Sequence, residues 1–453
     1  MHTDYFDYVR GLFDRSKIDG KPEALKGIRV LDFTHMIFGP TVAKTLALFG
    51  AEVIKVEVPY IGDYWRTSTY WGKYWKHSNP FYHFINPNKY FVGIDVKYPE
   101  GKELILKLAE MSDVVIENFA AGTAEAWGIG YTQISKINPK IIYASCSTFG
   151  QFGPDKFRPG WDMLAQGVSG AIGVTGYPDT DLRFKIPDYY GDFQPGNYAA
   201  MFVLAALRYR QKTGKGQYLD IAQGEILMRE MFHFTYMSAT GKSIGATGNN
   251  DPTMAPSGIF KTQDKTFLAL AVSNDMQFKA LCKAMQRLDL AQDPRYEKAP
   301  ERLKAQNADL LNKLVSNWIA CNKANEILDL AKIHGFAATR VMNDVDLCND
   351  EWRRERGSVV EFDDEMYKKL VLPAAPVQLS ETPGRLKWLS RPLGYHNRYV
   401  FKKLLKLSDD EIKMLQDKRV VGNWDYHVGQ RPPVYYDIQQ DKMFNYKEET
   451  NGQ

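Results

Sequence analysis

The hydrophobic positions near the beginning of the chain predict a strand, a helix and a second strand. Residues 27–57 read GIRVLDFTHMIFGPTVAKTLALFGAEVIKVE. IRVLDF and AEVIKVE are short apolar runs typical of buried strands, whereas TVAKTLALFG has helical spacing and ends at Gly50. Two strands joined by a helix form a βαβ unit, in which the strands are parallel.

The same alternation continues along the chain. YPEGKELILKLAEMSD predicts a helix, and DVVIENF and PKIIYASCSTFG each predict a strand. Alternating strands and helices are typical of a parallel sheet with helices on both faces. We therefore expect residues 27–225 to form the first part of a large, doubly wound, Rossmann-like α/β domain.

The pattern changes at about Ala246. The stretch GIFKTQDKTFLALAVS predicts a hairpin that turns at residues 263–265, and apolar periodicity predicts helices at 275–288 and 307–321. A hairpin followed by helices predicts a smaller α+β domain over residues 246–335.

The remaining segments complete the predicted organisation. Residues 350–422 return to the large domain and contain LSDDEIKMLQDKR, which predicts a helix. Residues 1–26 form a charged lead-in, and residues 423–453 form a tail rich in Pro, Tyr and Asp.

Composition and charge narrow the class of protein. The chain of 453 residues has 58 basic and 54 acidic side chains, and this balance does not indicate a nucleic-acid partner. Its longest apolar run of interest, residues 198–207, is too short for a membrane span of about 20 residues. The four cysteines form no CxxC pair, which is typical of reduced thiols: Cys146, Cys282, Cys321 and Cys348. We therefore expect a soluble cytoplasmic protein.

The common cofactor and catalytic motifs are absent from the sequence. A dinucleotide fingerprint needs three close glycines so that the backbone can approach a pyrophosphate, but the first turn, DFTHMIFGP, has only Gly39. The sequence has no P-loop, HExxH, GxSxG or metal-ligand cluster. We therefore expect neither a metal site nor a permanently bound cofactor.

Asp192 stands before an apolar helix in the stretch GDFQPGNYAAMFVLAALRYRQKTGKGQ. One interpretation is structural, because a carboxylate at a helix N-terminus accepts from free N–H groups and Pro195 suits a first helical turn. The other is catalytic: Gly191 and Gly196 remove side-chain bulk, which would let a ligand approach a nucleophilic carboxylate. Spacing alone favours the structural role.

A series of motifs resembles the class III CoA-transferases, the group of formyl-CoA:oxalate and carnitine CoA-transferases. The motifs keep the family's order: GIRVLDFTHMIFGP, NPNKYFVGIDVKYPEGK, DVVIENFAAGTAEAWGIGY, NPKIIYASCSTFGQFGP, GDFQPG, RQKTGKGQYLDIAQGE and GNNDPTMAPSGIFKT. The resemblance covers roughly residues 27–420. It implies an interlocked homodimer that moves CoA from an acyl-CoA thioester to a free carboxylic acid.

The resemblance gives Asp192 the role of the family's nucleophilic aspartate. Its carboxylate would attack the thioester and carry covalent aspartyl intermediates. Gly191 and backbone N–H groups at the helix start would stabilise the oxyanions that form. The positions expected to contact coenzyme A are Ile37, Phe38, Lys89, Asn118, Phe119 and Gly191.

The related α-methylacyl-CoA racemases need a proton-shuttling histidine in an RxGHD-type motif. Here the motif reads RPGWD, with Trp161 in the histidine's place. An indole does not exchange protons as an imidazole does, so the sequence favours a transferase over a racemase. We expect Trp161 to be a core residue.

Three arginines that the family commonly uses near coenzyme A are replaced by Val58, Ala120 and Ala126. These losses favour an alternative in which the chain is a non-catalytic partner subunit of a heteromeric transferase, whereas Asp192 favours a catalytic homodimer. Phosphate binding would be weaker, or would shift to cations that equally fit a solvated face: Lys55, Arg66, Lys73 and Lys76.

The acceptor acid is left open. Residues 60–84, YIGDYWRTSTYWGKYWKHSNPFYHF, are dense in aromatic side chains. They fit a packed insertion or a dimer contact, and they also fit an aromatic-lined pocket for a bulky or aromatic acid.

Overall fold

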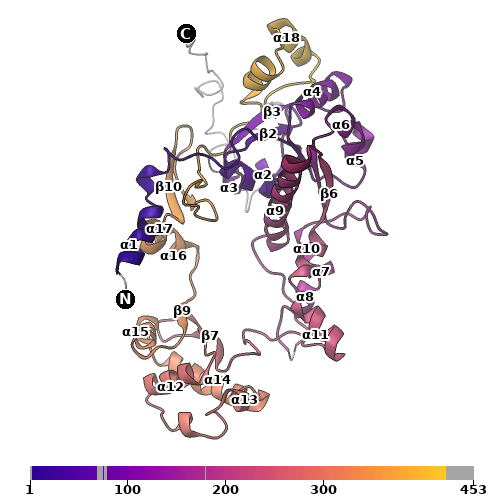
Figure 1. Ribbon diagram of the computed structural model, residues 1–453. Coiled ribbons are helices and arrows are strands. Elements are labelled where there is room, and N and C mark those ends of the chain that lie inside the picture. Colours follow the sequence, from indigo (N-terminus) through magenta and orange to yellow (C-terminus); the bar gives the residue numbers. More distant parts are fainter. Residues whose placement is uncertain (1–2, 69–74, 76–78, 179, 425–453) are drawn as a thin grey trace. The chain divides into compact units, whose positions relative to one another are not determined.

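The computed structural model describes residues 3–68, 75, 79–178 and 180–424. The chain divides into two compact units (Figure 1). The first comprises Met1–Ser169, Ile186–Glu230 and Asp350–Gln453, and the second comprises Gly170–Lys185 and Met231–Asn349. The second unit contains the predicted small domain, 246–335, and extends beyond it on both sides. Most of the predicted tail, from residue 425 onward, lies outside the described residues.

The first unit is built on a parallel sheet of six strands. The strand order is β3-β2-β1-β4-β5-β6, the order of a doubly wound Rossmann sheet, and each neighbouring pair is parallel. The strands are β1 (Arg29–Asp32), β2 (Glu52–Glu57), β3 (Lys89–Gly93), β4 (Val114–Glu117), β5 (Ile142–Ser147) and β6 (Gln217–Ala222). The predicted α/β class and parallel sheet are confirmed.

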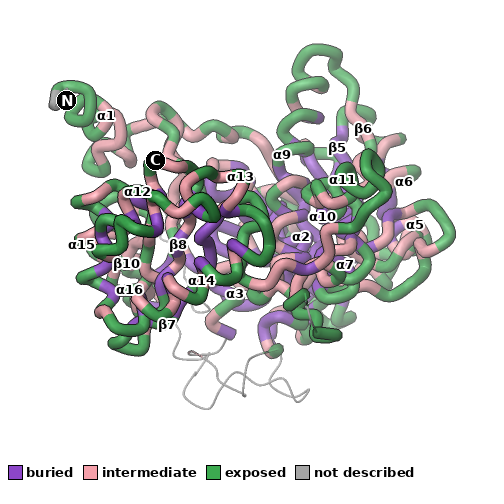
Figure 2. Tube along the Cα trace, turned by 90° about the horizontal axis from the view of Figure 1, so that it is seen from below, coloured by how far each residue is buried: buried purple, intermediate pink, exposed green. Residues whose placement is uncertain are grey.

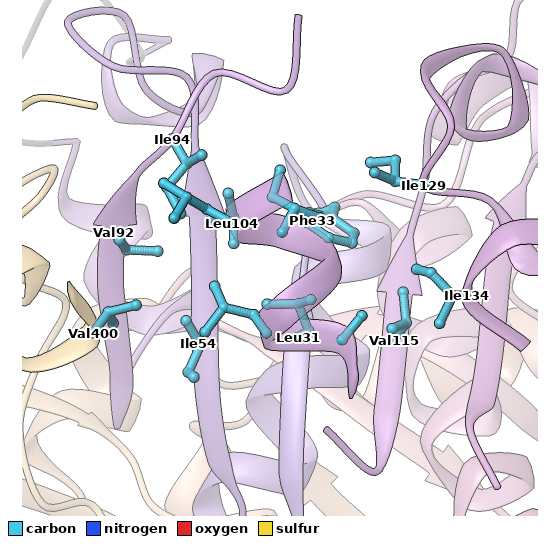
Figure 3. Packing of buried hydrophobic residues seen from close by; sticks show 14 of the residues in the cluster. Leu31, Phe33, Ile54, Val92, Ile94, Leu104, Val115, Ile129, Ile134 and Val400 are labelled. Atoms are coloured by element: carbon cyan, nitrogen blue, oxygen red, sulfur yellow. The ribbon is translucent and has the colours of Figure 1, made fainter. Parts of the chain in front are cut away.

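Helices cover both faces of this sheet because successive strand residues point to opposite sides. Helices α4 (Pro99–Glu110), α5 (Thr123–Trp127) and α6 (Tyr131–Ile137) pack on one face. Figure 3 shows side chains of four strands and two helices on this face: Leu31, Ile54, Val92, Val115, Leu104 and Ile134.

The opposite face packs against α2 (Phe38–Leu48) and α9 (Tyr190–Thr213). Every residue of α2 except Thr45 is buried (Figure 2), so this helix lies in the middle of the unit. Gly196 lets α9 approach α2 closely, since a Cβ there would lie 2.8 Å from Thr41 Cβ and 2.9 Å from the Phe38 carbonyl oxygen.

Shorter elements complete the first unit. The predicted C-terminal helix is α18 (Asp409–Asp417), which begins with a capping box between Ser408 and Glu411. Strands β10 (Val359–Asp364) and β11 (Lys368–Pro373) form an antiparallel hairpin. The remaining helical segments are α1 (Thr3–Leu12), η1 (Arg15–Lys17), η2 (Tyr64–Arg66), α3 (Pro80–Ile85), α7 (Asp162–Val168), α10 (Gln223–Arg229), α17 (Glu351–Arg356) and the π-helical η5 (Tyr399–Leu404).

The second unit has its own sheet and core. Strands β7 (Ser257–Lys261) and β8 (Phe267–Ala271) form the predicted hairpin, and β9 (Ala338–Arg340) pairs antiparallel with β8. Its helices are α8 (Ala171–Val174), α11 (Phe232–Thr240), α12 (Asp275–Ala284), η4 (Leu290–Gln292), α13 (Ala299–Arg302), α14 (Ala305–Ala320), α15 (Ala324–His334) and α16 (Asp344–Asn349). Helices α12, α14 and α15 supply most of the helical side chains that bury β8.

None of the described helices combines the length and the apolar character that crossing a membrane requires.

Candidate active site

A cavity of about 240 Å³ opens in the first unit at the carboxyl ends of its parallel strands. The strand order reverses between β1 and β4, and doubly wound sheets bind ligands at such a switch point. Residues that follow four strands line the cavity: His35 and Met36 after β1, Asn118 and Phe119 after β4, Thr148 after β5 and Gln223 after β6. Asp192 also lines it.

The Asp192 side chain enters this cavity from the first turn of α9. It is only 9% exposed, and its Oδ1 accepts a hydrogen bond from Gln223 Nε2 at 2.5 Å. Among the described residues, the carboxylate accepts no hydrogen bond from a backbone amide of α9. The capping role that the spacing favoured is therefore not the role that the side chain has in this structure.

The electrostatic surroundings of Asp192 disfavour its charged form. Burial, assisted by the nearby Asp162 carboxylate, raises the pKa of Asp192 to about 7, although the Gln223 hydrogen bond acts in the opposite direction. Within the described part of the chain, neither carboxylate has an ion-pair partner. A buried carboxylate without a counter-ion is a stronger base than one at the surface, which suits a nucleophile.

Asp162 anchors the beginning of α9. Its Oδ1 accepts a hydrogen bond from the Gly191 amide at 2.7 Å, and the Gln166 side chain donates to the same carboxylate at 3.1 Å. A Cβ on Gly191 would lie 2.5 Å from the Asp162 carbonyl oxygen. Gly191 therefore serves close packing rather than ligand access, and its amide, expected to stabilise an oxyanion, is occupied in this structure.

Gln223 and Thr148 are functional candidates that the sequence did not reveal. Gln223 is the first residue of α10 and is 3% exposed, and its Oε1 accepts from Thr148 Oγ1 at 2.6 Å. The pairing of Ser147 with Ala222 brings these two residues together, because each directly follows its strand. The sequence signal that could have identified them is that each is a polar residue directly after a strand, and that the two strands are neighbours in the sheet.

Asn118 and Phe119, which the resemblance assigns to coenzyme A binding, line the cavity and shape the turn after β1. Asn118 accepts from the His35 amide and donates to the His35 carbonyl, both at 2.9 Å. The Phe119 ring lies 5.8 Å from the imidazole of His35, a cavity residue whose pKa burial lowers. Phe38 also lines the cavity, whereas Ile37 is 1% exposed within a hydrophobic cluster.

The lysines and arginine expected to meet phosphate groups are buried in ion pairs instead. Lys89 Nζ lies 2.9 Å from Asp32 Oδ2 and does not line the cavity. Lys55 pairs with Asp63, and Arg66 pairs with Glu57, with all four side chains at most 1% exposed. Lys73 and Lys76 lie outside the described residues. The basic side chains that do line the cavity are Lys156 and Arg158, which the motifs did not single out.

Trp161 is not a core residue, contrary to expectation. It is 58% exposed and lies at the cavity, directly before Asp162. Of the three positions that lack the family's arginines, Ala120 lines the cavity, and Val58 and Ala126 are exposed elsewhere.

The aromatic segment at 60–84 is partly described. Trp65 and Tyr82 are buried in a cluster with Ile37, which supports the packing interpretation for these two rings. Residues 69–74 and 76–78 of the segment lie outside the described residues.

Comparison with known proteins explains the shared order of the motifs. The family model described as CoA-transferase family III matches residues 25–397. The chain belongs to this family. The family membership and the enzyme class that the motifs predicted are therefore confirmed.

Individual relatives agree with this assignment. The transferase is 33% identical to the succinyl-CoA–D-citramalate CoA-transferase of Chloroflexus aurantiacus, over 88% of this chain and 98% of that protein. It is 32% identical to the beta subunit of succinyl-CoA–L-malate CoA-transferase of the same organism, with the same coverage. A crystal structure of a CAIB/BAIF family protein from Brucella suis matches with a TM-score of 0.75 and 31% identity, over 84% of this chain and 99% of that one.

Proposed function

We propose that this transferase moves CoA between two carboxylic acids through covalent intermediates on Asp192. The observation that carries the proposal is the Asp192 carboxylate itself, which lines the cavity at the switch point, is nearly buried and lacks a cationic partner among the described residues. Such a carboxylate is available for nucleophilic attack once it is ionised.

The reaction proceeds by exchange at three carbonyl carbons, those of the donor, of Asp192 and of the acceptor. Asp192 attacks the thioester carbonyl of the donor, and the CoA thiolate leaves, which gives a mixed anhydride. The thiolate then attacks the Asp192 carbonyl, releases the donor's acid and forms an aspartyl-CoA thioester. The acceptor carboxylate displaces CoA from Asp192 to form a second anhydride. The thiolate finally attacks the acceptor acyl carbon and regenerates the Asp192 carboxylate.

For substrates, we propose acyl-CoA thioesters and acceptors that are small dicarboxylic acids. Two relatives at about one-third identity are named for succinyl-CoA with citramalate or malate, which are both dicarboxylates. Lys156 and Arg158 are cations at the cavity that suit the phosphate or carboxylate groups of such substrates. A bulky or aromatic acceptor receives less support, since Trp65 and Tyr82 are buried.

We further propose that the catalytic form is a homodimer. The outer face of α9 carries exposed apolar side chains that a second subunit would cover: Met201, Phe202 and Leu204. The alternative is a heteromer in which this chain is one of two related subunits, as the subunit names of the malate relatives suggest. Sedimentation of the purified chain, with an assay of each peak, distinguishes the two arrangements.

Asp192→Asn tests the proposed chemistry. The wild-type protein is expected to exchange CoA between succinyl-CoA and members of a panel containing citramalate, malate, glutarate and an aromatic acid, without ATP or a metal ion. The amide is a poor nucleophile, so we expect Asp192→Asn to lose at least about 1,000-fold in kcat while it remains folded. Hydroxylamine added during turnover should modify Asp192.

The matched control is Asp188→Asn, since Asp188 is an exposed carboxylate four residues earlier with a left-handed backbone that Asn tolerates. It should exchange CoA at the wild-type rate and escape hydroxylamine. A folded Asp192→Asn protein with wild-type exchange would exclude the covalent mechanism.

A further inference from the structure

Gln223 is the one described side chain that donates a hydrogen bond to the Asp192 carboxylate. It comes from the beginning of α10, which directly follows the edge strand β6. Its Nε2 reaches Asp192 Oδ1 at 2.5 Å and the Gly191 carbonyl oxygen at 3.0 Å. Asp192 Oδ2 has no such partner among the described residues, so the two carboxylate oxygens are not equivalent.

The hydrogen-bonding neighbours determine the orientation of the Gln223 amide. On one side lie two acceptors, the Gly191 carbonyl and the Asp192 carboxylate, and these require the NH₂ group. On the other side lies the Thr148 hydroxyl, which donates to Oε1 at 2.6 Å. A flipped amide would place its oxygen against the Gly191 carbonyl. Thr148 therefore acts as a positioning residue that keeps the N–H groups directed at Asp192.

We propose that the Gln223 side-chain amide is the oxyanion donor for the steps that occur at the Asp192 carbonyl. This inference rests on the proposed covalent function of Asp192. Because Gln223 holds Oδ1, the unpaired Oδ2 makes the bond to the donor's acyl carbon, and Oδ1 becomes the carbonyl oxygen of the anhydride.

The oxyanion forms when the CoA thiolate attacks this anhydride. The sulfur bonds to the Asp192 Cγ, and the electron pair of the C=O bond moves to Oδ1, which already accepts from Gln223. The pair then returns, and the bond from Cγ to Oδ2 breaks, so that Oδ2 leaves with the donor's acid and Oδ1 remains as the thioester oxygen. A donor aimed at the oxygen where charge develops stabilises the transition state more than the ground state.

The neighbouring backbone amide does not compete for this role. The Gly191 N–H, the donor that the helix start would otherwise offer, is bound to Asp162 Oδ1 at 2.7 Å. Gln223 thus supplies, from the first residue of α10, the donor that the Gly191 amide cannot offer while it is bound to Asp162.

Isotope exchange between succinyl-CoA and labelled succinate tests the inference, because this exchange passes through every covalent step with a single acid. We expect Gln223→Ala to lower the exchange kcat about 100-fold while KM for succinyl-CoA changes less than about threefold. The same variant should move the pH midpoint of kcat/KM upward, since the Gln223 hydrogen bond lowers the pKa of Asp192. Thr148→Val should lose about tenfold, and Thr148→Ser, which keeps the hydroxyl, should stay near wild type.

The controls separate this inference from the proposed function. Gln211→Ala removes an exposed glutamine of α9 and should match the wild type. If Asp192→Asn is inactive and a folded Gln223→Ala protein keeps wild-type kcat and pH midpoint, Gln223 is not the oxyanion donor, although the covalent mechanism stands. If Gln223→Ala does not fold, Gln223→Met, which has a similar length and cannot donate, decides the question by the same kcat criterion.

Discussion

Two groups of buried charges in the first unit differ in whether they have counter-ions. The paired-charge cluster consists of Asp32, Lys55, Asp63 and Lys89, in which Lys89 pairs with Asp32 at 2.9 Å and Lys55 with Asp63 at 3.0 Å. The carboxylate pair consists of Asp162 and Asp192, and its hydrogen bonds come from amide groups alone. Of these six side chains, Asp192 alone lines the cavity at the carboxyl ends of the strands.

The pKa of the aspartate is shifted in opposite directions in the two groups. Burial by itself would raise the pKa of Asp32, but Lys89 and Lys55 outweigh this effect and hold the pKa below its usual range. In the carboxylate pair, no cation offsets burial, and the pKa of Asp192 rises to about 7. The comparison separates buried charges that have counter-ions, and that are costly to break apart, from a buried carboxylate without one, which we propose as the nucleophile.

The largest expected effect on stability comes from breaking the paired-charge cluster. Lys89→Met leaves Asp32 buried without its closest counter-ion, so we expect the free energy of unfolding to fall by about 3–5 kcal/mol. Adding Asp32→Asn removes the orphaned charge and should recover part of this loss. Urea unfolding of the two variants measures both changes.

The same variants test whether Lys89 binds coenzyme A, which remains a prediction from the family resemblance. Because its amine is committed to Asp32, Asn86 and the Pro40 carbonyl, we expect KM for the CoA thioester in the folded double variant to equal that of the wild type. A several-fold rise in KM would give Lys89 a role at the substrate.

The substitution Asp192→Asn is expected to change the free energy of unfolding by a smaller amount and in the opposite direction, so that the protein becomes more stable. A carboxylate whose folded pKa is raised contributes stability below its unfolded pKa, near 3.8, and loses that contribution as the pH rises through about 7. Asp192→Asn cannot ionise, so its stability advantage over the wild type should grow between pH 5 and pH 8, by on the order of 2 kcal/mol. Thermal unfolding at the two pH values measures the difference, and an advantage that does not grow would mean that the ionised carboxylate is not destabilising.

The sequence predicted those features that depend on local patterning. Apolar runs predicted β1, β2, β4 and β5, and the turn at 263–265 predicted the β7–β8 hairpin. Strand β3 was not predicted as an element, although its segment, NPNKYFVGIDVK, was matched to the family. Family resemblance selected Asp192, which the spacing alone had favoured as a cap.

The features that were missed depend on contacts between distant segments. Gln223 meets Asp192, which lies 31 positions earlier in the chain, only because β6 pairs with β5 and α9 packs beside them. Lys55 and Arg66 were considered for phosphate binding because the sequence does not show that Asp63 and Glu57 neutralise them. Trp161, the residue before α7, is exposed at the cavity rather than buried.

The smallest expected effect is a shift in the pH dependence of activity when Asp162, the other member of the carboxylate pair, is replaced. Asp162 contributes to the raised pKa of Asp192 through its negative charge, second in importance to burial. Asp162→Asn keeps an oxygen for the Gly191 amide and removes the charge, so the pKa of Asp192 should fall. Since the proposed mechanism requires an ionised Asp192, the midpoint at which kcat/KM rises with pH should move to lower pH by about half to one unit, or about 1 kcal/mol. The exposed Asp188→Asn should leave the midpoint unchanged, which controls for a general change in charge. If the Asp162→Asn protein is folded and its midpoint equals that of the wild type, then burial alone sets the acidity of Asp192 and Asp162 serves only to anchor α9.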